Sequence, residues 1–173
     1  MSEPIRTRTV TWQDPRRVVD AAAKMSGIEL LRAIGNGDVP PPPMAQLVGL
    51  TPELAEDGRV IFAMTPAEYH YNTMGVVHGG AIATLVDTAL GCAVMSKMPQ
   101  GNGYTTVELH LNVVRPVTAA TGRILCEAII VHSGSRMATA EAKVRDESGK
   151  LYAHATTTCF VYPLPSPSHP NPL

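Results

Sequence analysis

One run of the chain, residues 81–95, is almost wholly apolar and contains no proline. Apolar side chains occur on every helical face of this run, which is typical of a helix that is buried on all sides. Its fifteen residues are too few to span a bilayer, so we expect a core helix. Asp87 is the only acidic or basic residue in the run. Burying a carboxylate without partners is costly, and Asp87 therefore predicts either a structural hydrogen bond or a functional role.

Gly79 and Gly80 stand where this helix is expected to begin. The first N–H groups of a helix have no partner inside it, and the helix dipole places partial positive charge there. Such amides suit an anion or a polarised carbonyl oxygen, although a tight turn would need the same two glycines. Further along, Thr84 and Thr88 share a small polar stripe with Asp87, which lets a ligand or a second chain approach closely.

The spacing of Gly79 and Asp87 limits how they can cooperate. Asp87 follows Gly79 by eight residues, which is about 12 Å along a helix. One reacting carbon cannot contact both groups of a single helix. If the two groups cooperate, they come from two copies of the chain that face each other across a two-fold axis. If these residues form the functional site, we expect a homodimer or a dimer of dimers, with its sites at the subunit interface.

The residues around this helix resemble those of a known family. The matching residues are Asn72, Gly75, the His78-Gly79-Gly80 triplet, Leu85, Asp87, residues 104–109 and the Val114-Arg115-Pro116 ending. This pattern is similar to that of the hotdog-fold acyl-CoA thioesterases, and most of all to their phenylacetate-degradation (PaaI-like) branch, across residues 47–161. The resemblance implies an α+β hotdog fold, in which an antiparallel sheet wraps around a long central helix. It also implies hydrolysis of acyl-CoA or aryl-acyl-CoA thioesters, with coenzyme A as part of the substrate and no separate cofactor.

The resemblance assigns a role to each matching residue. Gly79 corresponds to the glycine whose N–H hydrogen-bonds the thioester oxygen, and Asp87 to the acid that attacks the carbonyl or activates water. Asn72 corresponds to a residue that orients the carbonyl or the water, although a loop asparagine is also a common turn former. His78 matches the histidine before the glycines, in a substrate-binding or a purely structural role. Thr106 aligns with a serine or threonine that positions the attacking water.

Strand alternation conflicts with this role for Thr106. The alternation places Thr106 on one face with Glu108 and His110, opposite Val107 and Leu109. Thr106 then points away from the site, unless its face meets the partner's helix or the strand bulges.

Several further residues are candidates for binding the substrate. Gly80 and Thr88 lie beside the expected oxyanion and acid positions. Gly134 and Arg136 belong to a turn where the family often has a basic residue near the nucleotide end of coenzyme A, and Arg115 is a second basic candidate. Arginine suits phosphate, although an arginine is more commonly a solvated surface charge.

Composition narrows the alternatives. The chain has 14 lysine and arginine residues against 15 aspartate and glutamate residues, without a basic block, so nucleic-acid binding has little support. The N-terminus lacks the apolar stretch of a secretory signal, and we expect a cytoplasmic protein with no membrane partner. Cys92, Cys126 and Cys159 are widely spaced, which argues against a disulfide framework and against a metal site.

The 173 residues are expected to divide into three segments. Residues 1–43 are expected to form a helical extension that ends in a proline linker, with helices near residues 16–24 and 28–34. Residues 44–162 are expected to form the thioesterase domain. The proline-rich residues 163–173 predict a disordered tail.

The domain carries several strand patterns besides its helix. Residues 45–51 and 59–65 predict a hairpin with a moderately long acidic loop. Beyond the helix, short turns between strand-like runs indicate an antiparallel meander, and alternating alanines in the last two runs let a helix lie close to the sheet. The four runs are residues 106–113, 123–132, 136–145 and 151–162.

Two other functions fit parts of this pattern. A hotdog module that binds acyl-CoA without hydrolysing it would be favoured by a missing carboxylate, whereas Asp87 is present. A hotdog dehydratase would need a proline-rich motif around its catalytic histidine, and His78 has none. Tyr69, His70 and Tyr71 either line an acyl pocket or pack elsewhere. The identity of the acyl group stays open between aryl-acetyl, short-chain and medium-chain.

Overall fold

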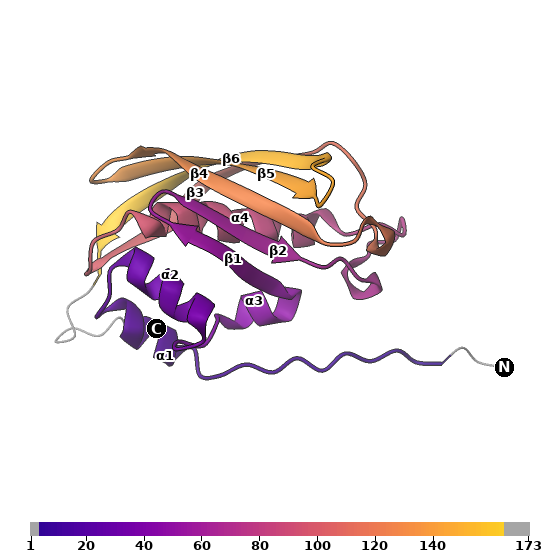
Figure 1. The fold of residues 1–173 in the computed structure, drawn as a ribbon, viewed down its shortest axis with the longest axis horizontal. Coiled ribbons are helices and arrows are strands. Elements are labelled where there is room, and N and C mark those ends of the chain that lie inside the picture. The colour runs from indigo at the N-terminus through magenta and orange to yellow at the C-terminus, as the bar shows by residue number, and fades with distance from the viewer. Residues whose placement is uncertain (1–3, 165–173) are drawn as a thin grey trace.

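A six-stranded antiparallel sheet wraps around one long helix, α4 (Gly79–Ser96), in the computed structural model, which describes residues 4–164 (Figure 1). Across the sheet the strands follow the order β1-β2-β4-β5-β6-β3. Their bounds are Leu50–Glu56 (β1), Arg59–Met64 (β2), Asn102–Val113 (β3), Ile124–Ser133 (β4), Met137–Asp146 (β5) and Leu151–Pro163 (β6). This is the α+β arrangement that the sequence pattern predicts, and it is the hotdog fold that the family resemblance implies.

Helix α4 forms the centre of the core. Its 18 residues make it slightly longer than expected, and by length and composition alone it could cross a membrane. Half of it is buried inside the fold, as is typical of a core helix. The small side chains of Ala138, Ala140 and Ala142 on β5 are buried against it, which confirms the predicted alanine face. Small residues on the sheet let the helix backbone come close.

Three short helices precede the sheet (Figure 1). They are α1 (Arg16–Ala22), α2 (Gly27–Asn36) and α3 (Pro43–Val48). The second and third pack against β1 and α4, and the first packs against the second. Helix α2 begins with a capping box, in which Glu29 accepts a hydrogen bond from the Ser26 backbone N–H at 2.8 Å. It ends at Gly37, whose φ of 83° suits glycine.

The predicted strand at residues 45–51 is wrong. Pro43 is the first residue of α3, a position where its fixed φ favours a helical turn. Gly49 then ends the helix with a φ of 77°, and β1 starts at Leu50. The hairpin of β1 and β2 exists, but its connection is only Asp57-Gly58 and not a longer acidic loop.

The predicted four-stranded meander is also only partly correct. Strands β4, β5 and β6 are consecutive neighbours, whereas β3 pairs with β6 at the edge of the sheet. The reason is the connection between β3 and β4, which contains Pro116 and the short 3-10 helix η2 (Ala119–Thr121). A connection of this length, unlike a tight turn, does not force its two strands to be neighbours.

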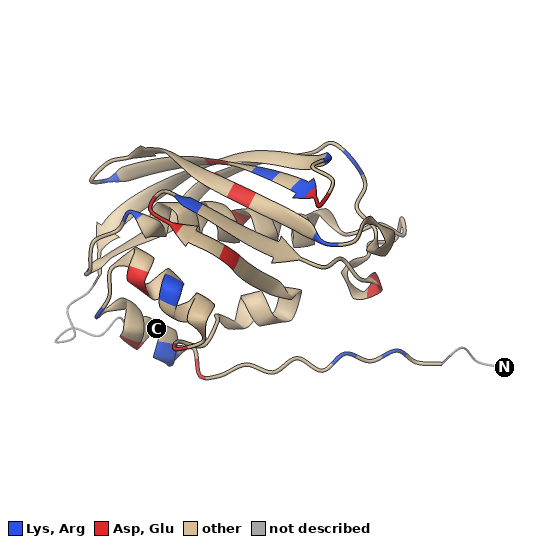
Figure 2. Cartoon of the chain, in the orientation of Figure 1, with Lys and Arg blue, Asp and Glu red and all other residues tan. Residues whose placement is uncertain are grey.

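Charged residues of both signs are interspersed over the helices and strands (Figure 2). Pro163 ends β6, and residues 165–173 of the predicted tail lie outside the described residues.

Candidate active site

Asp87 and Thr106 meet between α4 and β3. The Thr106 hydroxyl donates a hydrogen bond to Asp87 Oδ1 at 3.0 Å. Simple alternation places Thr106 on the outer face, and that prediction is wrong because the register of β3 against β6 shifts between Thr106 and Glu108. A β-bulge of this kind inserts one extra residue and reverses the side-chain phase. Val107 and Glu108 therefore both face outward, and Thr106 faces the helix.

Tyr104 faces inward two residues before Thr106, and it contacts α4 one turn beyond Asp87. A Cβ atom added at Gly91 would lie only 2.4 Å from the Tyr104 hydroxyl oxygen, so the glycine makes room for the ring. Burial raises the pKa of Tyr104 well above its usual range, so this hydroxyl stays neutral. Sequence reasoning assigned Tyr104 no role; the signals were its two-residue spacing from Thr106 and the glycine one turn after Asp87.

A cavity of about 390 Å³ opens beside Asp87. Thr88 lines it with Asp87, as expected for a residue next to the substrate, and Cys92 and Tyr104 complete this wall. Burial, with the nearby Asp87 charge, raises the pKa of the Cys92 thiol to about 12, so the thiol stays protonated. The remaining lining residues come from β1, β2, the N-terminal helices, the proline segment before α3 and Met95 of α4, and all of them are apolar.

The start of α4 presents one free amide. His78 is the N-cap residue, and its Nδ1 accepts a hydrogen bond from the Gly80 N–H at 2.8 Å. Within residues 4–164 the exposed Gly79 N–H has no hydrogen-bond partner. Gly79, rather than Gly80, thus offers a donor to a ligand. For His78 the geometry favours the structural alternative, because the ring caps the helix.

The loop before α4 is held by its own side chains. Asn72 Oδ1 accepts a hydrogen bond from the Met74 N–H at 2.8 Å, which is the turn-forming alternative for this residue. His70 is buried, and its carbonyl oxygen accepts a hydrogen bond from the His78 N–H at 2.8 Å. The Tyr71 hydroxyl accepts one from the Ala119 N–H. These contacts fix the loop that leads to the Gly79 amide.

The other predicted substrate-binding residues are not brought to Asp87. Arg115 is exposed and donates to the Leu151 carbonyl oxygen, and Arg136 is exposed on the turn before β5. Gly134 donates its N–H to the Met137 carbonyl oxygen at 2.9 Å in the same turn. None of these three residues is among the described residues that line the Asp87 cavity. Within residues 4–164 we also find no cluster of three metal-ligating side chains.

An antiparallel sheet wrapped around a long central helix defines a hotdog-fold protein, and this helix carries an acid, Asp87, and a free amide at its start. The family model of the thioesterase superfamily matches residues 74–153. Mouse (Mus musculus) acyl-coenzyme A thioesterase 13 is 32% identical over 114 residues, which cover 65% of this chain and 76% of the mouse protein. The chain belongs to the thioesterase superfamily, and this membership supports thioester hydrolysis as its reaction class.

Solved structures share this fold. A conserved protein of Pseudomonas aeruginosa is 33% identical with a TM-score of 0.64, covering 68% of this chain and 92% of the other. The Escherichia coli PaaI protein from the phenylacetic acid degradation operon has a TM-score of 0.67 at 20% identity, covering 79% and 94% of the two chains. The second likeness shows a shared fold with the PaaI protein.

Proposed function

We propose that this protein hydrolyses acyl-CoA or aryl-acyl-CoA thioesters to the free acid and coenzyme A, at sites built by two copies of the chain. The observation that carries the proposal is the hydrogen-bonded pair of Asp87 and Thr106 beside an apolar cavity, combined with the free Gly79 amide. Thioester hydrolysis requires an acid that attacks or activates water, a donor that polarises the carbonyl, and a pocket that holds the acyl group.

The geometry supports a shared site. Gly79 and Asp87 lie eight residues apart on one continuous helix, which is about 12 Å. A homodimer, alone or as a dimer of dimers, would bring the Gly79 amide of one copy to the Asp87 of the other. Strand β3 is the edge strand next to β6 and carries Asp87's partner Thr106. An unpaired edge of this kind suits pairing with a second copy of the chain.

In the proposed reaction, the Gly79 N–H donates a hydrogen bond to the thioester carbonyl oxygen and stabilises the negative charge that develops there. Asp87 attacks the carbonyl carbon or removes a proton from the attacking water. The Thr106 hydroxyl holds the carboxylate in place. The carbon–sulfur bond then breaks, and coenzyme A leaves as a thiolate that takes up a proton released by the water. In the direct-attack route, water next hydrolyses the mixed anhydride of the acyl group and Asp87, which releases the free acid and regenerates the carboxylate. In the general-base route, the oxygen of water enters the free acid directly.

Release of free thiol from a panel of acyl-CoA thioesters tests this proposal. Asp87→Asn keeps the size of the side chain and its capacity to accept from Thr106 but removes the charge. We expect the variant to be slower by about two orders of magnitude or more while remaining a folded oligomer. The matched control is Asp38→Asn, because Asp38 is exposed just after α2 and does not line the cavity.

Two outcomes would overturn parts of the proposal. Full activity of Asp87→Asn would make Asp87 a structural carboxylate. Tight acyl-CoA binding without hydrolysis by the wild-type protein would instead support a binding module. Interference from the protein's own thiols is expected to be small in this assay, because burial raises the pKa of all three cysteines, to about 12 for Cys92 and Cys126.

A further inference from the structure

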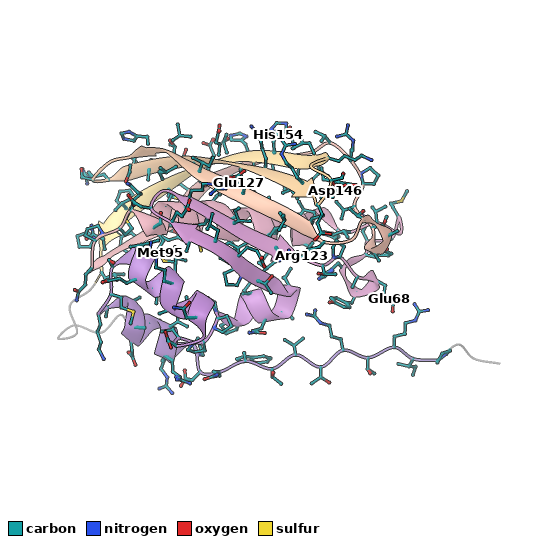
Figure 3. All side chains as sticks on the ribbon, viewed as in Figure 1. Glu68, Met95, Arg123, Glu127, Asp146 and His154 are labelled. Atoms are coloured by element: carbon teal, nitrogen blue, oxygen red, sulfur yellow. The ribbon has the colours of Figure 1, made fainter. Side chains whose placement is uncertain are left out.

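The N-terminal extension forms a large part of the wall of the Asp87 cavity, although it lies outside residues 74–153, the stretch that the family model matches. Leu30, Leu31 and Ile34 of α2 line the cavity, together with Pro41 and Pro42. Met95, on the last turn of α4, lines the cavity and also packs against α2 (Figure 3). The extension therefore closes a space that begins at the candidate acid.

This wall is fixed to the core. The Gly27 N–H donates a hydrogen bond to the Met98 carbonyl oxygen at 2.9 Å, which ties the start of α2 to the segment just after α4. A Cβ atom at Gly27 would lie 1.7 Å from the Met95 carbonyl oxygen, so only glycine permits this approach. At the other end of α2, Pro40 to Pro42 form a stiff segment that leads into α3. The extension is thus anchored on both sides of the cavity.

The polar residues of the cavity lining come from one side of it. Asp87 and Thr88 belong to α4 and Tyr104 to β3, whereas α2 and the prolines contribute apolar residues. A thioester whose carbonyl lies at Asp87 therefore has its acyl group directed toward α2. Its polar end would meet the acid, and its apolar end would displace water from Leu30 and Ile34.

We propose that α2 is the end wall of the acyl pocket, and that the preferred substrate carries an apolar acyl group of medium length. The inference rests on the proposed thioesterase function. At about 30 Å³ for each water-sized group, a cavity of about 390 Å³ holds roughly a dozen such groups. An acetyl group would leave most of this space unfilled, whereas an acyl chain of about eight to twelve carbons would fill it. Each further buried methylene improves transition-state binding about fourfold until the chain reaches α2.

Two substitutions of Ile34 move this wall in opposite directions. Ile34→Trp fills the α2 side of the cavity and Ile34→Ala enlarges it. The matched control is Val19→Trp, because Val19 lies on the same extension, is 66% exposed and does not line the cavity. The readout is kcat/KM for straight-chain substrates from acetyl-CoA to myristoyl-CoA, with oligomeric state and Tm measured for every variant.

We expect wild-type kcat/KM to rise with chain length and to peak between octanoyl-CoA and dodecanoyl-CoA. Ile34→Trp should lose about tenfold or more on decanoyl-CoA and change by less than about twofold on butyryl-CoA. Ile34→Ala should move the optimum to longer chains, and it carries the test if the tryptophan variant does not fold. Val19→Trp should keep the wild-type profile.

The outcomes separate this inference from the proposed function. A profile that neither Ile34 substitution shifts would overturn the assignment of α2 as the end wall and leave thioester hydrolysis standing. A wild-type protein that prefers acetyl-CoA would overturn the medium-length acyl group. Absence of hydrolysis across the whole panel would overturn the proposed function itself, and the inference with it.

Discussion

The Thr106 hydroxyl lies 3.0 Å from Asp87 Oδ1, and a β-bulge in β3 is what brings the two together. Without the bulge, Thr106 would face away from α4. Within residues 4–164 this is the only side-chain hydrogen bond that Asp87 accepts. A bulge disrupts strand pairing locally, and here it aims one side chain at the candidate acid.

Thr106→Val removes the hydroxyl with little change in shape. Hydrogen bonds to charged groups contribute about 1.5–3 kcal/mol, so we expect kcat to fall by about 10- to 100-fold. KM should change little, because the hydroxyl acts on Asp87 and not on the bound acyl group. Steady-state kinetics on the best thioester from the panel measures both values.

Two variants control for this prediction. Thr106→Ser keeps the hydroxyl and should recover most of the activity. Thr105→Val lies one residue earlier on the exposed side of β3 and should behave as wild type. Equal activity of Thr106→Val and wild type would show that the hydrogen bond has no part in catalysis.

Alanine substitutions at two helical glycines are expected to change the free energy of unfolding in opposite directions. Gly91→Ala places a Cβ atom 2.4 Å from the Tyr104 hydroxyl oxygen, and displacing the ring should cost about 1–3 kcal/mol of unfolding free energy. Gly35→Ala meets nothing within 4 Å in α2 and should gain up to about 1 kcal/mol. Urea unfolding of both variants measures the difference. A Gly91→Ala protein as stable as Gly35→Ala would contradict the packing of Tyr104 against α4.

The site shows what local pattern can predict and what it cannot. The central helix, the acid on it and the glycines at its start follow from composition, periodicity and capping, which are local properties. The inward turn of Thr106 depends on the register of β3 against β6, which involves residues far apart in the sequence. The same limit explains why β3 was expected beside β4.

The contribution of the N-terminal extension to the cavity wall cannot be predicted from the sequence, for a related reason. The helical extension itself is readable from its caps and prolines. Its docking onto α4 depends on Gly27 meeting the Met95 and Met98 carbonyl groups, a contact without a sequence signature. The apolar content of residues 45–51 fits a strand as well as a helix, and the strand is the wrong choice. Pro43 at the first helical position and Gly49 at the end favour the helix.

The buried side chain of His70 leads us to expect a loss of stability in mild acid. Burial lowers the pKa of His70 and the nearby Arg8 charge lowers it further, against the hydrogen bond to the Val48 carbonyl oxygen, which raises it. Below the unfolded pKa of about 6.5, the unfolded chain therefore binds a proton that the folded chain does not. Stability from this group is complete above that pH and falls as the pH decreases through it. We expect Tm to drop between about pH 7.5 and about pH 5.5.

His70→Asn tests the assignment of this drop. Asn cannot take up a proton, so the variant should have a lower Tm at neutral pH but a smaller decrease on acidification. His154→Asn is the control, because His154 is exposed on the outer face of the sheet (Figure 3). An equally steep decrease in His70→Asn and wild type would assign the acid sensitivity to other groups.

The shared site is the central claim of the proposed function, and mixed dimers test it most directly. Gly79→Pro removes the N–H of the first helical residue, where proline fits, and His78 with a ψ of 136° tolerates a following proline. This variant and Asp87→Asn should each be nearly inactive alone. A dimer of one Gly79→Pro chain and one Asp87→Asn chain regains a single complete site, made of the Asp87 of one copy and the Gly79 of the other.

The decisive measurement is thioester hydrolysis after the two variants are unfolded together in equal amounts and refolded. With random pairing, half of the dimers are mixed and each has one working site of two, so we predict recovery of about one quarter of wild-type activity. Each variant refolded alone should stay inactive. A mixture no more active than its parents, with mixed dimers demonstrated by mass spectrometry, would contradict a site shared between two chains.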